Sequence, residues 1–118
     1  MRFNAAITSW SIRAGTSGAG EPMFAPVALR HAISVELVDP SMRRVGDARS
    51  EGVQLEHAVL VPAAALAVAK IAPKVGDRVR LRRVRPFVHE TDLDVVFTQW
   101  IEGGRVVEIS LGERRDGQ

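Results

Sequence analysis

LDVVFTQWI (residues 93–101) and RVVEISL (residues 105–111) flank the dipeptide Gly103-Gly104. Both stretches are rich in β-branched and aromatic residues, which are typical of β-strands, and a Gly-Gly pair suits a two-residue type I′ hairpin turn. That turn predicts three cross-strand pairs: Trp100 with Val107, Thr98 with Ile109, and Glu102 with Arg105. The segment therefore indicates antiparallel β-structure.

Further strands are predicted upstream of this hairpin, where apolar and polar residues alternate. They cover residues 5–14, 27–38, 53–61 and 78–85. In the first of them, the alternation places Trp10 and Ile12 on the buried side and Ile7 on the opposite side. In the third, one side carries Val53, Leu55, His57, Val59 and Val61.

One helix and two exposed loops are predicted between the strands. The helix spans residues 62–72 (PAAALAVAKIA), because Ala is the best helix former and Pro is tolerated at a first helical position. Residues 15–22 (GTSGAGEP) form a loop, since Gly frees the backbone and Pro constrains it. Residues 41–52 are polar and lack an apolar stripe, so we expect an exposed excursion there.

The chain has 118 residues, 46% of them hydrophobic and 25% charged, which suits one soluble globular domain spanning residues 1–118. The predicted elements add up to a mainly β protein. We expect an antiparallel β-sandwich or small barrel of five to six strands with one short helix.

The sequence contains no motif that indicates an enzyme or a cofactor. It has no cysteine, which excludes disulfides and thiolate chemistry, and it has no phosphate-binding loop and no nucleophile elbow. Its three histidines are too widely spaced for a recognisable metal motif. The acidic stretch HETDLD (residues 89–94) is typical of a charged, solvated strand edge. We therefore expect a protein that is not an enzyme and binds no cofactor or metal.

The strongest local signal is a run of arginines in residues 78–85, made up of Arg78, Arg80, Arg82, Arg83 and Arg85. Such a positive stripe suits contact with DNA phosphates, RNA or an acidic protein surface, whereas a solvated edge strand protected by its charge is the alternative interpretation. In a regular strand, alternate arginines project together at about 6–7 Å spacing. The strand needs a bulge or an end at Arg82-Arg83, because Arg83 otherwise points into the buried face.

Four segments together resemble a known family. They are SIRAGTSGAGEP (11–22), the stretch 27–40 ending in VELVDP, SEGVQLEHAVLV (50–61), and GGRVVEI (103–109). In their order they are similar to the head–tail joining (adaptor or head-closure) proteins of tailed bacteriophages. The predicted helix and the arginine run depart from the family pattern, because they lie where a short connection is expected.

The resemblance implies a structural virion protein of the phage neck, made in the host cytoplasm. In that family, six copies form a ring that joins the portal to the tail and lets DNA pass. The implied partners are other copies of the chain, portal or adaptor proteins and tail proteins, with contact to the passing double-stranded DNA left open and no membrane. The candidate docking residues in the two loops are Gly18, Gly20, Glu21, Met42, Arg43, Arg44 and Arg49.

Two alternatives stay open from the sequence. The first is a small β-barrel that binds nucleic acid through the Arg78–Arg85 stripe, which predicts a strong dependence of affinity on salt. Aromatic residues make up only 5% of the chain, which disfavours a stacking platform for single strands. The second is another tail component, such as a tail terminator, with the same fold and partners.

Overall fold

The structure is a computed structural model that describes residues 2–50, 52–85 and 87–114. It is mainly β, as predicted, and all of its strand pairs are antiparallel. In chain order, the elements are β1 (Ala5–Thr16), β2 (Pro22–Val27), β3 (Ile33–Val38), α1 (Met42–Ser50), β4 (Val53–Pro62), α2 (Ala63–Ala69), β5 (Arg78–Arg83), β6 (His89–Ile101), a short 3-10 turn (Glu102–Gly104) and β7 (Val106–Arg114).

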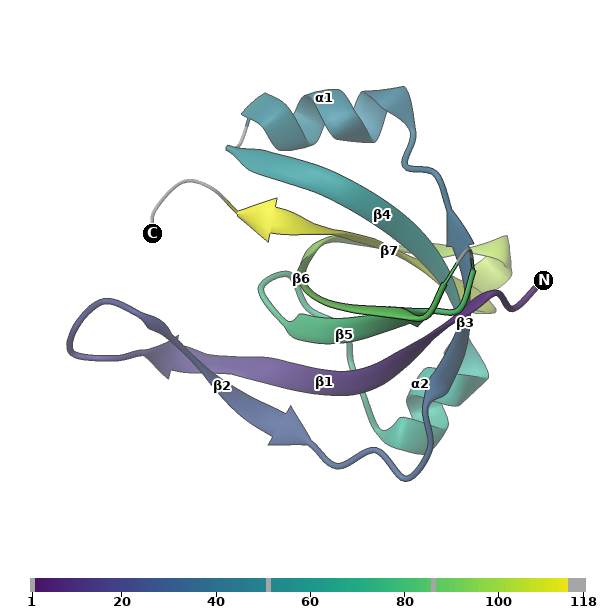
Figure 1. Ribbon diagram of the computed structural model, residues 1–118, viewed down its shortest axis with the longest axis horizontal. Helices are drawn as coiled ribbons and strands as arrows, with labels where there is room; N and C mark the ends of the chain where they lie inside the picture. The colour runs from purple at the N-terminus through teal and green to yellow at the C-terminus, as the bar shows by residue number, and fades with distance from the viewer. Residues whose placement is uncertain (1, 51, 86, 115–118) are drawn as a thin grey trace.

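Six of the seven strands close into a barrel (Figure 1). The ladder runs β1-β3-β4-β7-β6-β5, and β5 pairs back onto β1, from Ala5 opposite Arg83 to Ser11 opposite Arg78. The remaining strand, β2, pairs with the second half of β1 and forms a hairpin that projects beyond the barrel. Of the two predicted architectures, the small barrel is the one that forms.

The C-terminal hairpin has the predicted register. Trp100 pairs with Val107 and Thr98 pairs with Ile109. The turn is longer than the predicted two-residue type I′ turn, because Glu102 is also left-handed, with a φ of 52° beside 67° at Gly103 and 86° at Gly104. The ladder ends at Ile101 opposite Val106, so the predicted third pair, Glu102 with Arg105, is not a strand pair. Both residues lie within the turn, where the backbone N–H of Arg105 donates to the carbonyl of Glu102 at 3.3 Å.

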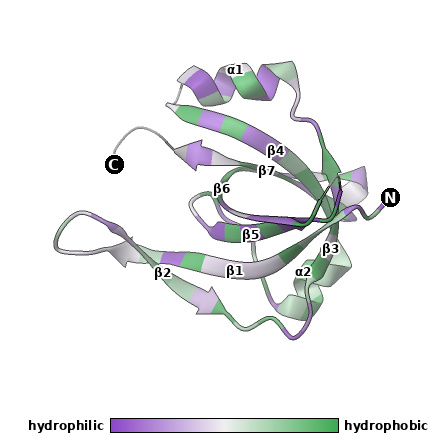
Figure 2. Ribbon diagram, in the orientation of Figure 1, coloured by the Kyte–Doolittle hydropathy of each residue, from purple (hydrophilic) through white to green (hydrophobic). Residues whose placement is uncertain are grey.

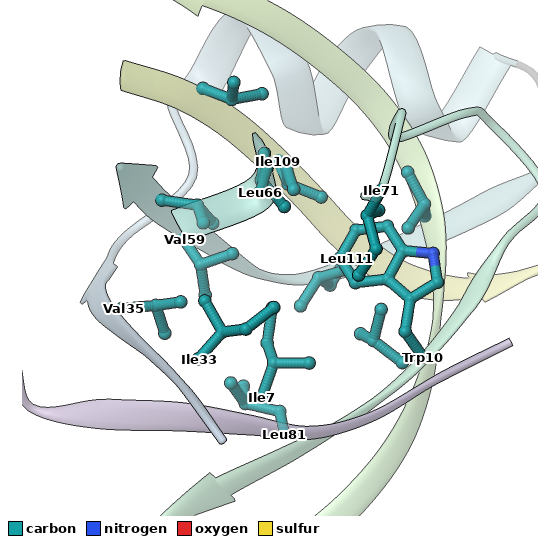
Figure 3. Packing of buried hydrophobic residues seen from close by; sticks show 14 of the residues in the cluster. Ile7, Trp10, Ile33, Val35, Val59, Leu66, Ile71, Leu81, Ile109 and Leu111 are labelled. Atoms are coloured by element: carbon teal, nitrogen blue, oxygen red, sulfur yellow. The ribbon is translucent and has the colours of Figure 1, made fainter. Parts of the chain in front are cut away.

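The barrel interior holds one apolar core. The Trp10 indole points toward the other labelled core residues, among them Ile71 and Leu111 (Figure 3). The alternation of hydropathy along β4 is visible in Figure 2. The core comprises Ile7, Trp10, Ile33, Val35, Val59, Val61, Leu66, Ile71, Val79, Leu81, Leu93, Val95, Val107, Ile109 and Leu111.

Two strands depart from the predicted alternation because each contains a register shift. In β1 the shift between Ile7 and Ser9 turns Ile7 inward with Trp10, so the prediction that placed Ile7 on the opposite side was wrong. In β4 the shift between Leu55 and His57 places Val53 and Leu55 in a second apolar cluster. That cluster lies apart from the barrel core, which takes the rest of the strand.

Three predicted segments also need correction. The stretch 27–38 is not one strand, because β2 ends at Val27 and β3 begins at Ile33. The helix predicted over 62–72 is shorter, and Lys70 ends it with a left-handed φ of 58°. The predicted excursion 41–52 contains helix α1, so residues 2–114, as far as the structure describes them, hold two α-helices where one was expected.

Helix α1 begins at a capping residue that the sequence interpretation overlooked. The Ser41 hydroxyl accepts a hydrogen bond from the backbone N–H of Arg44 at 3.2 Å, which satisfies one of the free donors of the first turn. The helix covers the second cluster, in which Ala48 is fully buried against Val53 and Val96. None of the helices in the described part of the chain is long and apolar enough to span a membrane.

Candidate functional site

The arginine run divides into two environments along β5. The strand is regular, with Val79 and Leu81 buried and Arg78, Arg80 and Arg82 on the outer face, as predicted. It ends at Arg83, so the expected strand end, and not a bulge, resolves the conflict of phase there. Because β5 lies between β1 and β6, it is not an edge strand, and the interpretation of the run as a charged, solvated edge was wrong.

Acidic residues on β6 neutralise the first half of the run. Arg78 Nε lies 3.0 Å from Asp94 Oδ1, and Arg80 Nε lies 2.9 Å from Asp92 Oδ1. Side-chain hydrogen bonding to Arg80 is the main cause that lowers the pKa of Asp92. The stretch 89–94 belongs to β6, which lies between β5 and β7. It is thus part of an inner strand of the sheet, in contrast to the predicted solvated edge.

Arg78 has a second partner on the hairpin. Its guanidinium carbon lies 4.2 Å from the centroid of the Phe24 ring, which is a cation–π contact. The planar group is thus held between an aromatic face and the carboxylate of Asp94. Arg78 and Arg80 therefore stabilise the barrel wall and its junction with the hairpin.

The second half of the run lines a basic pocket at the end of the barrel where β1 begins. We use this name for the cavity of about 800 Å³ lined by Arg2, Phe3, Asn4, Ala5, Ala6, Ser34, Leu37, Arg82, Arg83, Val84 and Arg85. Four of these residues are arginines, and none of the described residues lining the cavity is acidic. The pocket therefore concentrates positive charge.

Asn4 holds the N-terminal segment over this pocket. Its side-chain carbonyl accepts a hydrogen bond from the backbone N–H of Leu37 at 2.6 Å, and its backbone N–H donates to the Val35 carbonyl at 3.2 Å. These bonds place Arg2 and Phe3 beside the end of β5. The sequence interpretation did not include these two residues in the site, because only the pairing of β1 with β5 brings them to the arginines.

The charge of the basic pocket is felt by His57 on β4. Burial lowers the pKa of His57, and the positive charge of Arg83 lowers it further. This second cause is a consequence of the arrangement at the barrel end. The positive charge of Arg83 disfavours the protonated, positively charged form of His57.

The two predicted docking loops lie apart in Figure 1, with the tip of the β1–β2 hairpin at the left and α1 at the top. Gly18, Gly20 and Glu21 are exposed at the tip of the β1–β2 hairpin. The tip is ordered by Ser17, whose hydroxyl accepts from the backbone N–H of Glu21 at 3.1 Å. The loop is thus shorter than the predicted 15–22, since β1 continues to Thr16 and β2 begins at Pro22.

The other candidate docking residues belong to helix α1. Met42 is 85% exposed, and Arg43 and Arg49 are also exposed. Arg44 instead packs on the barrel: its guanidinium lies 4.9 Å from the Phe97 ring centroid and donates to Gln99 Oε1 at 2.7 Å. Arg44 therefore anchors the helix, while the other three side chains face solvent.

The β1–β2 hairpin carries an exposed apolar face that was not predicted from the sequence. The β1–β2 register places Ile12 opposite Ala25 and Trp10 opposite Val27, so these residues and Met23 share one side of the hairpin. We call the outer part of that side, formed by Ile12, Met23 and Ala25, the hairpin face. Ile12 is 43% exposed and Met23 is 52% exposed, which contradicts the predicted burial of Ile12.

The described residues contain no group of three or more His, Asp or Glu residues placed to hold a metal ion. Comparisons of the chain with protein-family models, with curated proteins and with solved structures find no match.

Proposed function

We propose that this chain is a structural virion protein of the phage neck, which assembles as a ring, joins the head to the tail and lets DNA pass. The sequence resemblance suggests this role. The structural observation that carries the proposal is the hairpin face, which continues the barrel core outward and is left uncovered in a single copy.

The hairpin face has the character of a surface that a partner covers. It begins at Trp10, which is fully buried, and runs along the same side of β1 to the half-exposed Ile12. Uncovered apolar side chains in a continuous stripe are unfavourable on a monomer, and they mark interaction sites. An adjacent copy of the chain, with its own barrel wall, is the partner that a ring supplies.

The contact uses side chains and not the edge of β2. Pro22 and Pro26 have no N–H to donate, and prolines of this kind protect edge strands against pairing with other strands. A projecting hairpin that packs its face on a different surface of the next copy makes a heterologous contact. Repetition of such a contact about a rotation axis closes a ring.

The proposal is tested by the double variant Ile12→Glu/Met23→Glu, which places charges on the hairpin face. The control is Val68→Glu, which places one such charge on a side chain that is 86% exposed on α2, a helix that packs against β4. Particle mass is measured at high protein concentration, alone and with the head and tail proteins of the same virion. Assembly of the wild type and the control, with loss in the double variant, supports the proposal. A wild type that stays monomeric with every partner contradicts it.

A tail terminator would use the same contact, and preferential binding to tail proteins over portal proteins would identify it. The alternative function, nucleic-acid binding through the whole Arg78–Arg85 stripe, is less well supported by the structure. Arg78 and Arg80 already bind carboxylates, so the regular row of three free arginines that motivated it is reduced to Arg82.

A further inference from the structure

The basic pocket combines features that point to a ligand with several negative charges. Its four arginines come from two segments that are far apart in sequence and are brought together by the β1–β5 ladder. Among the described residues, no carboxylate lies within salt-bridge distance of Arg2, Arg82, Arg83 or Arg85. The charges are therefore concentrated and available.

The arginines of β5 differ in whether they have an acidic partner. Cross-strand carboxylates hold Arg78 and Arg80, whereas Arg82 lies opposite Glu90 without an ion pair between them. Beyond Arg83 the ladder ends, and Val84 and Arg85 enter the loop toward β6. The end of the barrel thus carries a cluster of arginines that no carboxylate of the described residues neutralises.

A second copy of the chain is a poor source of the missing negative charge. Its densest acidic stretch, HETDLD (residues 89–94), already uses Asp92 and Asp94 in ion pairs with β5. A nucleic-acid backbone, in contrast, presents regularly spaced phosphates, and the planar guanidinium group binds phosphate oxygens in a bidentate manner. The exposed Phe3 ring adds an apolar surface for a sugar or base at the same cavity.

We propose that the basic pocket binds the phosphate backbone of nucleic acid through Arg2, Arg82, Arg83 and Arg85. The pocket lies at the opposite end of β1 from the hairpin face, so one copy can bind nucleic acid while its hairpin contacts a neighbour. Binding at this pocket does not require ring assembly, because every residue of the pocket belongs to a single copy.

The test is fluorescence anisotropy with a labelled 20-base-pair DNA duplex and the corresponding single strand, between about 50 and 300 mM salt. Four phosphate contacts predict a slope of log affinity against log salt of about −3 to −4. In the variant Arg82→Gln/Arg83→Gln/Arg85→Gln, the slope falls to about −1 and affinity at low salt drops at least about tenfold. Circular dichroism is used to check that the variant is folded. If the triple variant unfolds, the single variant Arg85→Gln, in the loop after β5, replaces it in the same titration.

The matched control is the triple variant Arg13→Gln/Arg30→Gln/Arg105→Gln, which removes the same charge from exposed sites outside the pocket. We expect it to retain most of the affinity and the salt slope. Equal losses of affinity in the two triple variants would show that binding depends only on net charge, and this result would overturn the proposal. The absence of wild-type binding to both DNA probes at 50 mM salt would also overturn it. Displacement of the duplex by poly-glutamate at equal charge concentration would assign the pocket to an acidic protein segment instead.

Discussion

Asp92 accepts two hydrogen bonds from the guanidinium of Arg80 across the β5–β6 ladder, one from Nε at 2.9 Å and one from Nη2 at 3.4 Å. This bidentate pair, with the Arg78–Asp94 pair beside it, explains why a dense arginine run does not act as one surface. Arginines that meet carboxylates within the sheet are structural, and those beyond the last acidic partner remain available for a ligand.

Removal of the Asp92 charge should make Arg80 available to an external anion. We expect Asp92→Asn to strengthen binding to duplex DNA and to make the salt slope steeper by up to about 0.9, which corresponds to one more phosphate contact. The control is Asp47→Asn, an equal change of charge on the exposed face of α1. Anisotropy titrations that show the same affinity and slope for the two variants would contradict the claim that Asp92 keeps Arg80 from binding DNA.

The pKa of His57 reports on the charge of the basic pocket. Burial and Arg83 hold this pKa below the ordinary value of 6.5, so the folded protein takes up the proton less readily than the unfolded chain does. The free energy of unfolding should therefore fall as the pH drops below 6.5 through the lowered pKa. We expect Arg83→Gln to raise the pKa of His57 in an NMR titration, and Arg30→Gln to leave it unchanged. An unaltered His57 pKa in Arg83→Gln would show that Arg83 does not contribute to the shift.

The hydrogen bond between Trp10 and Asp77 ties the barrel core to the turn before β5. Trp10 Nε1 donates to Asp77 Oδ2 at 3.1 Å, and the same oxygen accepts from the backbone N–H of Lys74 at 3.1 Å. Both side chains are buried. We expect Asp77→Ala to lower the free energy of unfolding by about 1–3 kcal/mol, because the buried indole N–H loses its acceptor. Asp77→Asn keeps an acceptor oxygen and should cost less in urea denaturation. Equal costs for the two variants would argue against this role.

Gly112 allows β7 to approach the irregular part of β4. A Cβ atom at this position would lie 2.2 Å from the carbonyl oxygen of Gln54, which is backbone and cannot easily move away. We expect Gly112→Ala to destabilise the protein by about 2–4 kcal/mol in urea denaturation. Gly46→Ala is the control, since an added Cβ in α1 meets nothing within 4 Å and should stabilise the helix by about 0.5–1 kcal/mol. A neutral Gly112→Ala variant would contradict the close approach.

The parts of the fold that could be predicted from the sequence depend on local signals. The Gly103-Gly104 turn and the alternation on both sides of it determine the C-terminal hairpin and its register. The register shifts in β1 and β4 could not be predicted, because a bulge depends on the partner strand and moves residues such as Ile7 to the other face. Helix α1 carried a usable signal in the capping residue Ser41, which the polar composition of its segment obscured.

The candidate sites depend more strongly on tertiary structure. The arginine run is evident in the sequence, but its neutralisation follows from the pairing of β5 with β6. The alternating acids of HETDLD match the alternating arginines, and that complementarity was a signal available from the sequence. The contribution of Arg2 and Phe3, in contrast, requires the β1–β5 ladder that closes the barrel. Exposure of the hairpin face likewise requires knowledge of where the barrel ends.

The proposal that this chain is a ring-forming protein of the phage neck is tested most directly by electron microscopy of the purified protein at high concentration, alone and with head and tail proteins of the same virion. Class averages are scored for rotational symmetry. We expect closed rings, with six-fold symmetry favoured, that disappear in Ile12→Glu/Met23→Glu. The absence of rings under every one of these conditions would contradict the proposal.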